Sequence, residues 1–297
     1  MNFSQLQSFV ALADTGSFTE AAYAIDLTQS AVSHALSALE SELGVTLLQR
    51  NRKGVVALTD VGQKIIPYVR TLLAQVETIE QAAKAARGET SGKLRLGSML
   101  SIVSPRVLAR VLTRFRASYP DIEVVLFEGT LREVGEWIEK SIVDVGFVLF
   151  PAQGIEVTPM TTDEMCVLVP LGHRLHTKAA VTPKDLQEEG WIMEKNQCVL
   201  QLLEMVVGPS RIRPQIRYQA SDSATILAMI REGLGITLMP RMVLPKKLEG
   251  IVALALDPPH QLQVGLAVRS QAMASPAAQL FVQTASTWIQ ESAFLHP

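Results

Sequence analysis

Residues 17–44 read SFTEAAYAIDLTQSAVSHALSALESELG and decide the fold of the N-terminal part of the chain. Ser17 and Glu20 have the spacing of a capping box, which predicts that a short helix begins there. A tight turn follows, and Thr28 can then cap a longer helix that ends near Leu43. The stretch therefore predicts two helices in quick succession.

The second of these helices has two different faces. Its apolar positions at 32, 35, 36 and 39 form one stripe, and the opposite side of its first turns carries small or polar side chains. Such a helix pair fits a helix-turn-helix, in which Gln29 and Ser33 would reach base edges and Ser30 a phosphate. The alternative is an ordinary amphipathic helix with a serine-rich face toward solvent. The candidate DNA-binding residues here are Thr28, Gln29, Ser30, Ser33, His34 and Ser37.

A basic turn follows this helix pair. Arg50, Arg52 and Lys53 lie between two short apolar runs, which predicts a hairpin whose turn contacts the phosphate backbone as the wing of a winged helix. A solvated turn is the alternative. Residues 1–60 carry these three basic residues against six acidic ones, a net charge of −3. DNA binding would therefore depend on local positive features and groove fit rather than on bulk charge.

A long helix is predicted over residues 60–87, with Thr59 as its cap. Its apolar residues recur alternately every four and every three positions, and this heptad pattern predicts a coiled-coil partner. The alternative is an amphipathic helix that packs on its own domain. Pro67 is expected to kink the helix early, and residues 88–92 form a flexible hinge. The predicted dimerisation residues are Ile65, Val69, Leu72, Val76, Ile79 and Ala83.

From residue 93 the pattern changes to alternating strands and helices. The first part predicts a β-α-β-α-β unit with a parallel sheet and covering helices, with strands at 94–98, 122–127 and 143–150. A similar unit is expected after it, with strands at 165–169, 215–219, 236–239 and 261–269 and helices near 200 and at 223–231 and 277–290. Two such α/β lobes predict a ligand cleft between them, at the carboxyl ends of strands.

Hydroxyl-bearing residues follow the first two of these strands. Ser98 and Ser101 come after the first strand, and Gly129 and Thr130 come after the second. Helix N-termini with hydroxyls can bind a carboxylate or a phosphate, because free N–H groups and the helix dipole point there. Ordinary helix capping is the commoner role of such residues and remains the alternative.

Composition excludes several other classes of protein. The chain has 297 residues, of which 48% are hydrophobic and 19% charged, as expected for globular domains. We expect no membrane span and no secretory signal, and Cys166 and Cys198 fit a reducing cytoplasm. His173 and His176 lack a third metal ligand nearby, and no nucleophile or phosphate loop is present. We therefore expect no enzyme activity, no metal and no cofactor.

Several stretches resemble the LysR-type transcriptional regulators. The DNA-binding signature of that family is similar to residues 18–22, 27–34, 39–40 and 43–44, and its wing and linker helix to 47–50 and 58–62. Weaker similarities to its effector domain occur, in the family's order, at 127–129, 144–146, 170–173 and 233–240. Ser30 departs from a frequent proline, and His34 and Ser37 stand where longer basic or amide side chains are common.

The resemblance implies a fold and a domain order. The expected architecture is α/β, with an N-terminal all-α winged helix-turn-helix, a long linker helix and a two-lobed α/β effector domain that resembles type II periplasmic binding proteins. The expected domains are 1–59 for DNA binding, 60–92 for the linker and hinge, and 93–297 for the effector. Within the last, lobe I is expected over 93–161 and 267–297, and lobe II over 162–266.

The resemblance also implies partners. These are double-stranded promoter DNA, a second copy of the chain in a homodimer or homotetramer, and a small-molecule inducer for which a carboxylate is one candidate. The expected effector residues are Ser98, Ser101, Gly129, Thr130, Met193, Cys198 and Ser221. Cys198 also resembles in position the reactive thiol of peroxide-sensing members, but no second cysteine follows it, so a cysteine that lines the effector cleft is preferred. A solute-binding protein is the alternative from another class, and the first ninety residues oppose it.

Overall fold

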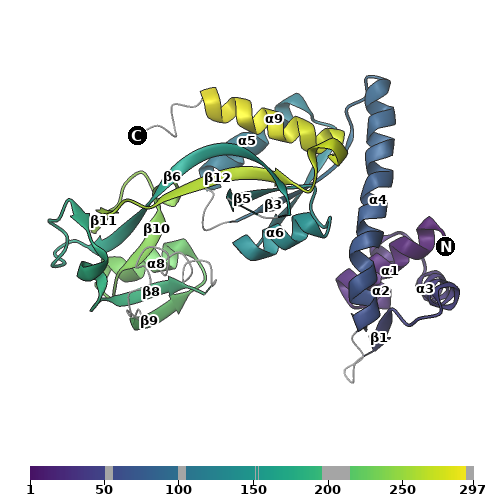
Figure 1. Ribbon diagram of the computed structural model, residues 1–297, viewed down its shortest axis with the longest axis horizontal. Helices are drawn as coiled ribbons and strands as arrows, with labels where there is room; N and C mark the ends of the chain where they lie inside the picture. The colour runs from purple at the N-terminus through teal and green to yellow at the C-terminus, as the bar shows by residue number, and fades with distance from the viewer. Residues whose placement is uncertain (51–55, 100–104, 151, 153, 196–214, 292–297) are drawn as a thin grey trace. The chain divides into compact units, whose positions relative to one another are not determined.

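The computed structural model describes residues 1–50, 56–99, 105–150, 152, 154–195 and 215–291 (Figure 1). The chain forms two compact units, which are described separately below. The first comprises Met1–Glu89 with Lys140–Ile142, and the second comprises Thr90–Glu139 with Val143–Pro297.

Three short helices begin the first unit, and their ends follow local capping chemistry. Asn2 and Ser17 accept hydrogen bonds from backbone N–H groups in the first turns of the first two helices, and Thr28 does the same for the third. Gly44 ends the third helix in the left-handed conformation, with φ 68°. The predicted helix pair and its boundaries are confirmed. The three helices are α1 (Phe3–Thr15), α2 (Phe18–Ala24) and α3 (Gln29–Leu43).

A two-stranded hairpin and a long helix complete this unit. The antiparallel strands β1 (Leu48–Arg50) and β2 (Val56–Leu58) confirm the predicted hairpin, and its turn lies outside the described residues. Helix α4 (Asp60–Ala86) begins at Thr59, whose Oγ1 accepts from Gly62 N at 3.0 Å. A Cβ at Gly62 would lie 2.1 Å from Leu47 O, so only glycine lets α4 approach β1 this closely.

Helix α4 packs on its own unit through some of the residues that the heptad pattern predicted to contact a second copy of the chain. Val69 is 7% exposed and Ile65 packs against the same apolar core, which α1, α2, α3, the hairpin strands and the start of α4 share. Val69 is therefore buried within its own unit, as expected for the alternative of a helix that packs on its own domain. Farther along α4, Leu72 and Ile79 are 39% and 68% exposed, Val76 is half-buried and Ala83 is exposed.

The second unit begins with the predicted parallel arrangement. Strand β3 lies between β4 and β5 and pairs in parallel with both. Helices α5 and α9 cover one face of this sheet and α6 covers the other (Figure 1). Phe115 and Phe281 pack edge to face between α5 and α9, with ring centroids 5.2 Å apart. The elements are β3 (Gly92–Ser98), α5 (Pro105–Ser118), β4 (Ile122–Glu128), α6 (Leu131–Glu139), β5 (Val145–Phe150) and α9 (Pro276–Glu291).

One long strand joins this sheet to the second lobe. Strand β6 (Glu156–Pro170) pairs with β12 (Gln261–Val268) through its residues 156–164, and with two other strands through 165–170. Strand β12 also pairs with β5 over residues 263–267, so it belongs to the sheet of lobe I. This corrects the expectation that lobe II extends to residue 266.

The second lobe repeats the parallel unit of the first only in part. Strand β8 pairs in parallel with β9, and its Trp191 forms a parallel bridge to Ile236 just before β10. Strands β10 (Thr237–Pro240) and β11 (Ile251–Leu256) pair antiparallel with β6, which the sequence did not predict. Strands β7, β8 and β11 were not predicted, and the helix expected near residue 200 lies outside the described residues. The other elements of this lobe are β7 (Ala180–Val181), η1 (Pro183–Leu186), β8 (Gly190–Glu194), β9 (Gln215–Ala220), α8 (Ser223–Arg231) and η2 (Arg241–Val243); η3 (Gln271–Met273) precedes α9.

Candidate nucleic-acid interface and effector site

Helix α3 presents one face to its own unit and leaves the other free. Val32, Leu36 and Leu39 are buried against the apolar core, at 0%, 6% and 0% exposure. The opposite face consists of the residues predicted to contact DNA, all of them exposed: Thr28, Gln29, Ser30, Ser33, His34 and Ser37. No packing inside the first unit therefore covers the polar face that would enter a groove.

Two hydroxyls at the start of α3 form hydrogen bonds within the helix itself. Thr28 Oγ1 accepts from Ala31 N at 3.2 Å and lies 3.0 Å from Ser30 Oγ. Ser30 is therefore held by the N-cap rather than free to rotate.

The orientation of α3 relative to the hairpin depends on a residue that sequence reasoning missed. Glu40 Oε1 accepts from Leu47 N at 2.6 Å and from Leu48 N at 3.2 Å, which ties the last turns of α3 to β1. At the other strand, Val56 N donates to Gly16 O at 2.9 Å. The hairpin is thus held to the helices from both of its strands. Arg52 and Lys53 lie outside the described residues, as does the side chain of Arg50.

Part of the negative charge of residues 1–60 is neutralised within the unit. Asp14 forms an ion pair with Arg70 of α4, and Glu42 forms one with the N-terminal amine of Met1. These two carboxylates are among the six counted in the net charge of this segment. The negative charge of this segment that would repel DNA is therefore smaller than the net charge of −3 counted over residues 1–60.

Ser98 is the best-supported of the predicted effector residues. It lies at the end of β3 and is 1% exposed, and its Oγ has no hydrogen-bond partner among the described residues. A buried hydroxyl without a partner is uncommon and needs an explanation. Ser98 O accepts from Gly129 N at 3.1 Å, so the end of β3 lies against the start of the loop before α6.

Gly129 has a packing role. A Cβ at this position would lie 2.5 Å from the ring of Trp137, which itself packs against Phe127 with ring centroids 6.0 Å apart. The absence of a side chain at Gly129 therefore lets Trp137 cover the end of β4.

Thr130 forms the N-cap of α6, and the carboxylate of Glu133 accepts hydrogen bonds from it. Thr130 N and Thr130 Oγ1 both donate to Glu133 Oε2 at 2.8 Å, and Glu133 N donates to Thr130 Oγ1 at 3.2 Å. The hydrogen bond from Thr130 N has the largest effect on the Glu133 carboxyl, followed by the one from Thr130 Oγ1, and both lower its pKa. Ordinary capping, the alternative considered for this position, is what the structure shows.

The predicted residues of lobe II differ from one another in accessibility. Met193 lies in β8 and is 0% exposed, so in this structure it packs in the core of the lobe. Ser221 is exposed and precedes Asp222, the N-cap of α8. Ser101 and Cys198 lie outside the described residues. Cys166 is buried as predicted; its Sγ donates to Met239 O at 3.3 Å, and burial raises the pKa of its thiol to about 12.

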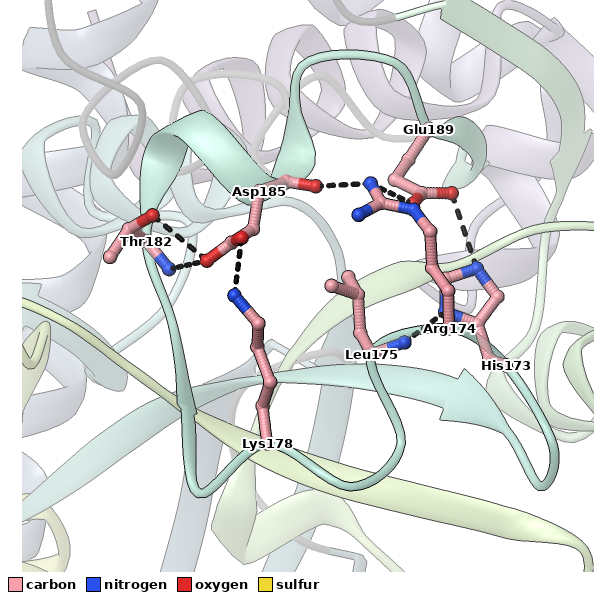
Figure 2. A network of polar contacts seen from close by, with 7 residues as sticks. All are labelled: His173, Arg174, Leu175, Lys178, Thr182, Asp185 and Glu189. Atoms are coloured by element: carbon pink, nitrogen blue, oxygen red, sulfur yellow. Dashed lines mark hydrogen bonds and ion pairs between the residues drawn. The ribbon is translucent and has the colours of Figure 1, made fainter.

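The His-x-x-His segment forms part of a polar network between two loops (Figure 2). His173 Nδ1 accepts from Leu175 N at 3.3 Å, and its Nε2 lies 3.2 Å from Glu189 Oε2, whose other oxygen pairs with Arg174 Nη2 at 2.6 Å. Because one ring nitrogen accepts, the neutral ring carries its proton on Nε2.

The same two loops are joined again farther along. Lys178 Nζ lies 2.5 Å from Asp185 Oδ1 and holds the pKa of that carboxyl well below its usual range. Among the described residues no three His, Cys, Asp or Glu side chains come together to hold a metal ion. No helix in the described part of the chain is long and apolar enough to cross a membrane.

Comparison with known proteins identifies both units. Residues 3–63 match the model of the bacterial regulatory helix-turn-helix proteins of the lysR family, and residues 87–290 match the LysR substrate binding domain. The chain is 37% identical over 291 residues to the HTH-type transcriptional regulator YvbU of Bacillus subtilis, covering 96% of this chain and 98% of that one. It is 30% identical over 284 residues to the probable HTH-type transcriptional regulator LrrA of Synechococcus elongatus, covering 95% of each.

Solved structures agree with this fold. A full-length OxyR from Pseudomonas aeruginosa is similar with a TM-score of 0.80 at 20% identity, over 100% of this chain and 97% of that one. CbnR in complex with its target DNA is similar with a TM-score of 0.61 at 22% identity, over 97% and 99% of the two chains. With both domain models matched in order and relatives aligned along nearly their whole length, the chain belongs to the LysR family of bacterial helix-turn-helix transcriptional regulators.

Proposed function

We propose that this regulator binds double-stranded promoter DNA through the exposed face of α3, and that a small molecule bound by the second unit controls the DNA complex. The observation that carries the proposal is the uncovered polar face of α3, held in a fixed relation to the hairpin by Glu40. The similar fold of CbnR, which was solved with its target DNA, supports the same use of this unit. Binding to promoters would place the chain in the cytoplasm.

Gln29 is proposed as the base-reading side chain. It is exposed in the first turn of α3, and an amide can make a bidentate contact with adenine that is worth about 1–3 kcal/mol of discrimination. Ser33 lies one turn farther along the same face, and the basic residues of the wing would contact phosphates without reading sequence.

We propose a homodimer or homotetramer in which α4 contributes to the interface. The exposed apolar residues Leu72 and Ile79 are the support for this, since they extend the heptad pattern beyond the part of α4 that α1 covers. Two other residues of the heptad pattern, Ile65 and Val69, pack against the apolar core of the first unit and stabilise that unit.

The inducer site is proposed at the strand ends of the second unit. The buried, unpartnered hydroxyl of Ser98 supports it, and the match to a substrate binding domain supports the class of function. A relative named as a probable hydrogen peroxide-inducible genes activator, from Streptomyces viridosporus, is 28% identical over 243 residues, covering 80% of this chain and 77% of that one. A thiol-based response through Cys198 is therefore kept as the second candidate.

A gel-shift assay with the intergenic DNA upstream of the chain's own gene tests the DNA-binding proposal. We expect specific binding that Gln29→Ala weakens by about tenfold or more, with little change on random DNA. Gln7→Ala is the matched control, because Gln7 is an exposed glutamine on α1 of the same unit. Arg52→Ala should weaken binding to both kinds of DNA and reduce the salt dependence. Equal losses on specific and random DNA for Gln29→Ala would show that it does not read a base.

A further inference from the structure

We propose that the effector of this regulator carries a cationic, amine- or amidine-type group rather than a carboxylate. The inference rests on the proposed effector site and concerns the chemistry of its ligand. It is argued from the two helix N-termini that follow strands in the two lobes, and from the buried hydroxyl beside one of them.

At the N-terminus of α6, both donors of Thr130 are directed to a carboxylate of the chain. The backbone N–H and the hydroxyl of Thr130 both point to the same oxygen, Glu133 Oε2, at 2.8 Å each. A ligand carboxylate at this place would have to displace Glu133 and would then lie beside its negative charge. Both effects oppose an anion, whereas an ammonium or amidinium group could donate to Glu133 and leave the cap in place.

The N-terminus of α8, in the other lobe, is occupied in the same way. Asp222 Oδ1 accepts from Thr225 N at 2.8 Å, and Asp222 Oδ2 accepts from Thr225 Oγ1 at 2.7 Å. Hydrogen bonds from Thr225 lower the pKa of Asp222, as those from Thr130 lower the pKa of Glu133, so both carboxylates are ionised at neutral pH. Both side chains are also exposed and can meet a ligand. Each helix dipole is therefore already compensated by a charge of the chain.

The remaining charges near these strand ends do not favour an anion either. Glu128 is the exposed last residue of β4, directly before Gly129. Lys195 is the exposed cation beside the end of β9, where its backbone N donates to Ala220 O at 2.9 Å. Arg132 is a second exposed cation, in the first turn of α6, and it pairs with Glu136 at 2.8 Å. Three carboxylates, those of Glu128, Glu133 and Asp222, thus stand against Lys195 and an arginine that already has a carboxylate partner.

Ser98 supplies the second, independent observation. Its Oγ is nine-tenths buried or more and has no partner among the described residues, and its carbonyl is bonded to the N–H of Gly129 in the loop that leads to Thr130. A hydroxyl can accept a hydrogen bond from an ammonium or amidinium N–H as well as donate one. A cationic group could therefore be accepted by Ser98, which the bond to Gly129 places against the loop that leads to Thr130 and its partner Glu133.

Matched probes that differ in one group test the inference on the full-length chain. Benzamidine, benzamide and benzoate form one set, and 1,4-diaminobutane and butanedioate form a second of another shape. We expect the cationic member of at least one set to raise the melting temperature in a dose-dependent way, and the carboxylates to leave it unchanged. Stabilisation by a carboxylate, or no difference between cationic and anionic members in either set, would overturn the proposal.

Glu133→Gln identifies the group responsible. Glutamine at this position can still accept from the N-cap, so the fold of α6 is retained while the charge is removed. We expect the cationic probe to bind about tenfold more weakly to this variant. Glu139→Gln is the control, an exposed glutamate at the far end of the same helix, and should leave affinity unchanged. Equal effects of the two variants would also overturn the proposal. Because neither readout uses DNA, a failed gel shift would contradict the proposed function and leave this test intact.

Discussion

Replacing Glu40 by alanine should loosen the hairpin from the recognition helix. The change removes one carboxylate oxygen that accepts from two backbone N–H groups, those of Leu47 at 2.6 Å and Leu48 at 3.2 Å. Leu47 and Leu48 are 0% and 7% exposed, so water cannot readily replace the lost acceptor. Hydrogen bonds to a charged group contribute about 1.5–3 kcal/mol, and a buried donor left unpaired costs about 1–3 kcal/mol. These two values describe the same loss in different ways and are not added, so the expected destabilisation of the first unit is about 2–3 kcal/mol.

Hydrogen exchange resolved by residue measures this effect where it arises. The amides of Leu47 and Leu48 should exchange faster in Glu40→Ala than in the native chain, and the unit should melt about 10 °C lower or more. Glu42→Ala is the matched control, two residues away on the same helix; its carboxylate is half exposed and pairs with the N-terminal amine, so its loss should cost less than about 1 kcal/mol. DNA binding should weaken in Glu40→Ala because the wing is no longer held beside α3. Unchanged protection of these two amides would refute the reasoning, as would equal destabilisation by the two variants.

Four further expectations follow from the described geometry. Gly62→Ala should destabilise the first unit by about 1–3 kcal/mol, measured by thermal unfolding, because its Cβ would lie 2.1 Å from Leu47 O, just before β1; an unchanged melting temperature would show that α4 shifts freely. Leu72→Lys combined with Val76→Lys should dissociate the contact between copies, and unchanged sedimentation and DNA binding would exclude it. Cys198→Ser should leave both DNA binding and its response to mild peroxide as in the native chain; a peroxide effect lost in this variant would favour the thiol-based candidate. In that Cys198→Ser background, Cys166 should resist thiol reagents at pH 8 until the chain unfolds, because a pKa of about 12 keeps the thiol protonated, and rapid labelling of the folded chain would contradict its burial.

Features with local causes were predictable from the sequence. The caps at Ser17, Thr28 and Gly44 set the ends of α2 and α3 by hydrogen bonds within a few residues, so the helix-turn-helix could be read directly. The parallel strands of lobe I were predictable for a similar reason, since short helices between strands require the crossover that makes them parallel.

Features with distant causes were not predictable in the same way. A heptad pattern looks the same whether its apolar residues contact a second copy or their own domain. The sequence alone therefore could not show that Val69 packs in the core of the first unit. The hydrogen bonds of Glu40 join positions seven and eight residues apart, across the end of a helix, and a glutamate on a helix gives no sign of them. At Thr130 the spacing to Glu133 is that of a capping box, a local signal that favours the capping alternative given for this position.

Strand β6 has a consequence for how the second unit tolerates changes in chain length. Its two halves pair in different lobes, so its alternation of inward and outward side chains must fit both sheets at once. The pairing with β12 already contains one irregularity, which leaves Met160 without a partner residue. A one-residue deletion within 161–164, between this irregularity and the second lobe, would reverse the facing of side chains on one side of the change. The loop at 171–179, by contrast, begins where the strand ends and can change length without altering any register. Insertions should therefore survive in that loop and be lost from the strand, a difference that a library of single-residue insertions across residues 156–179 would display.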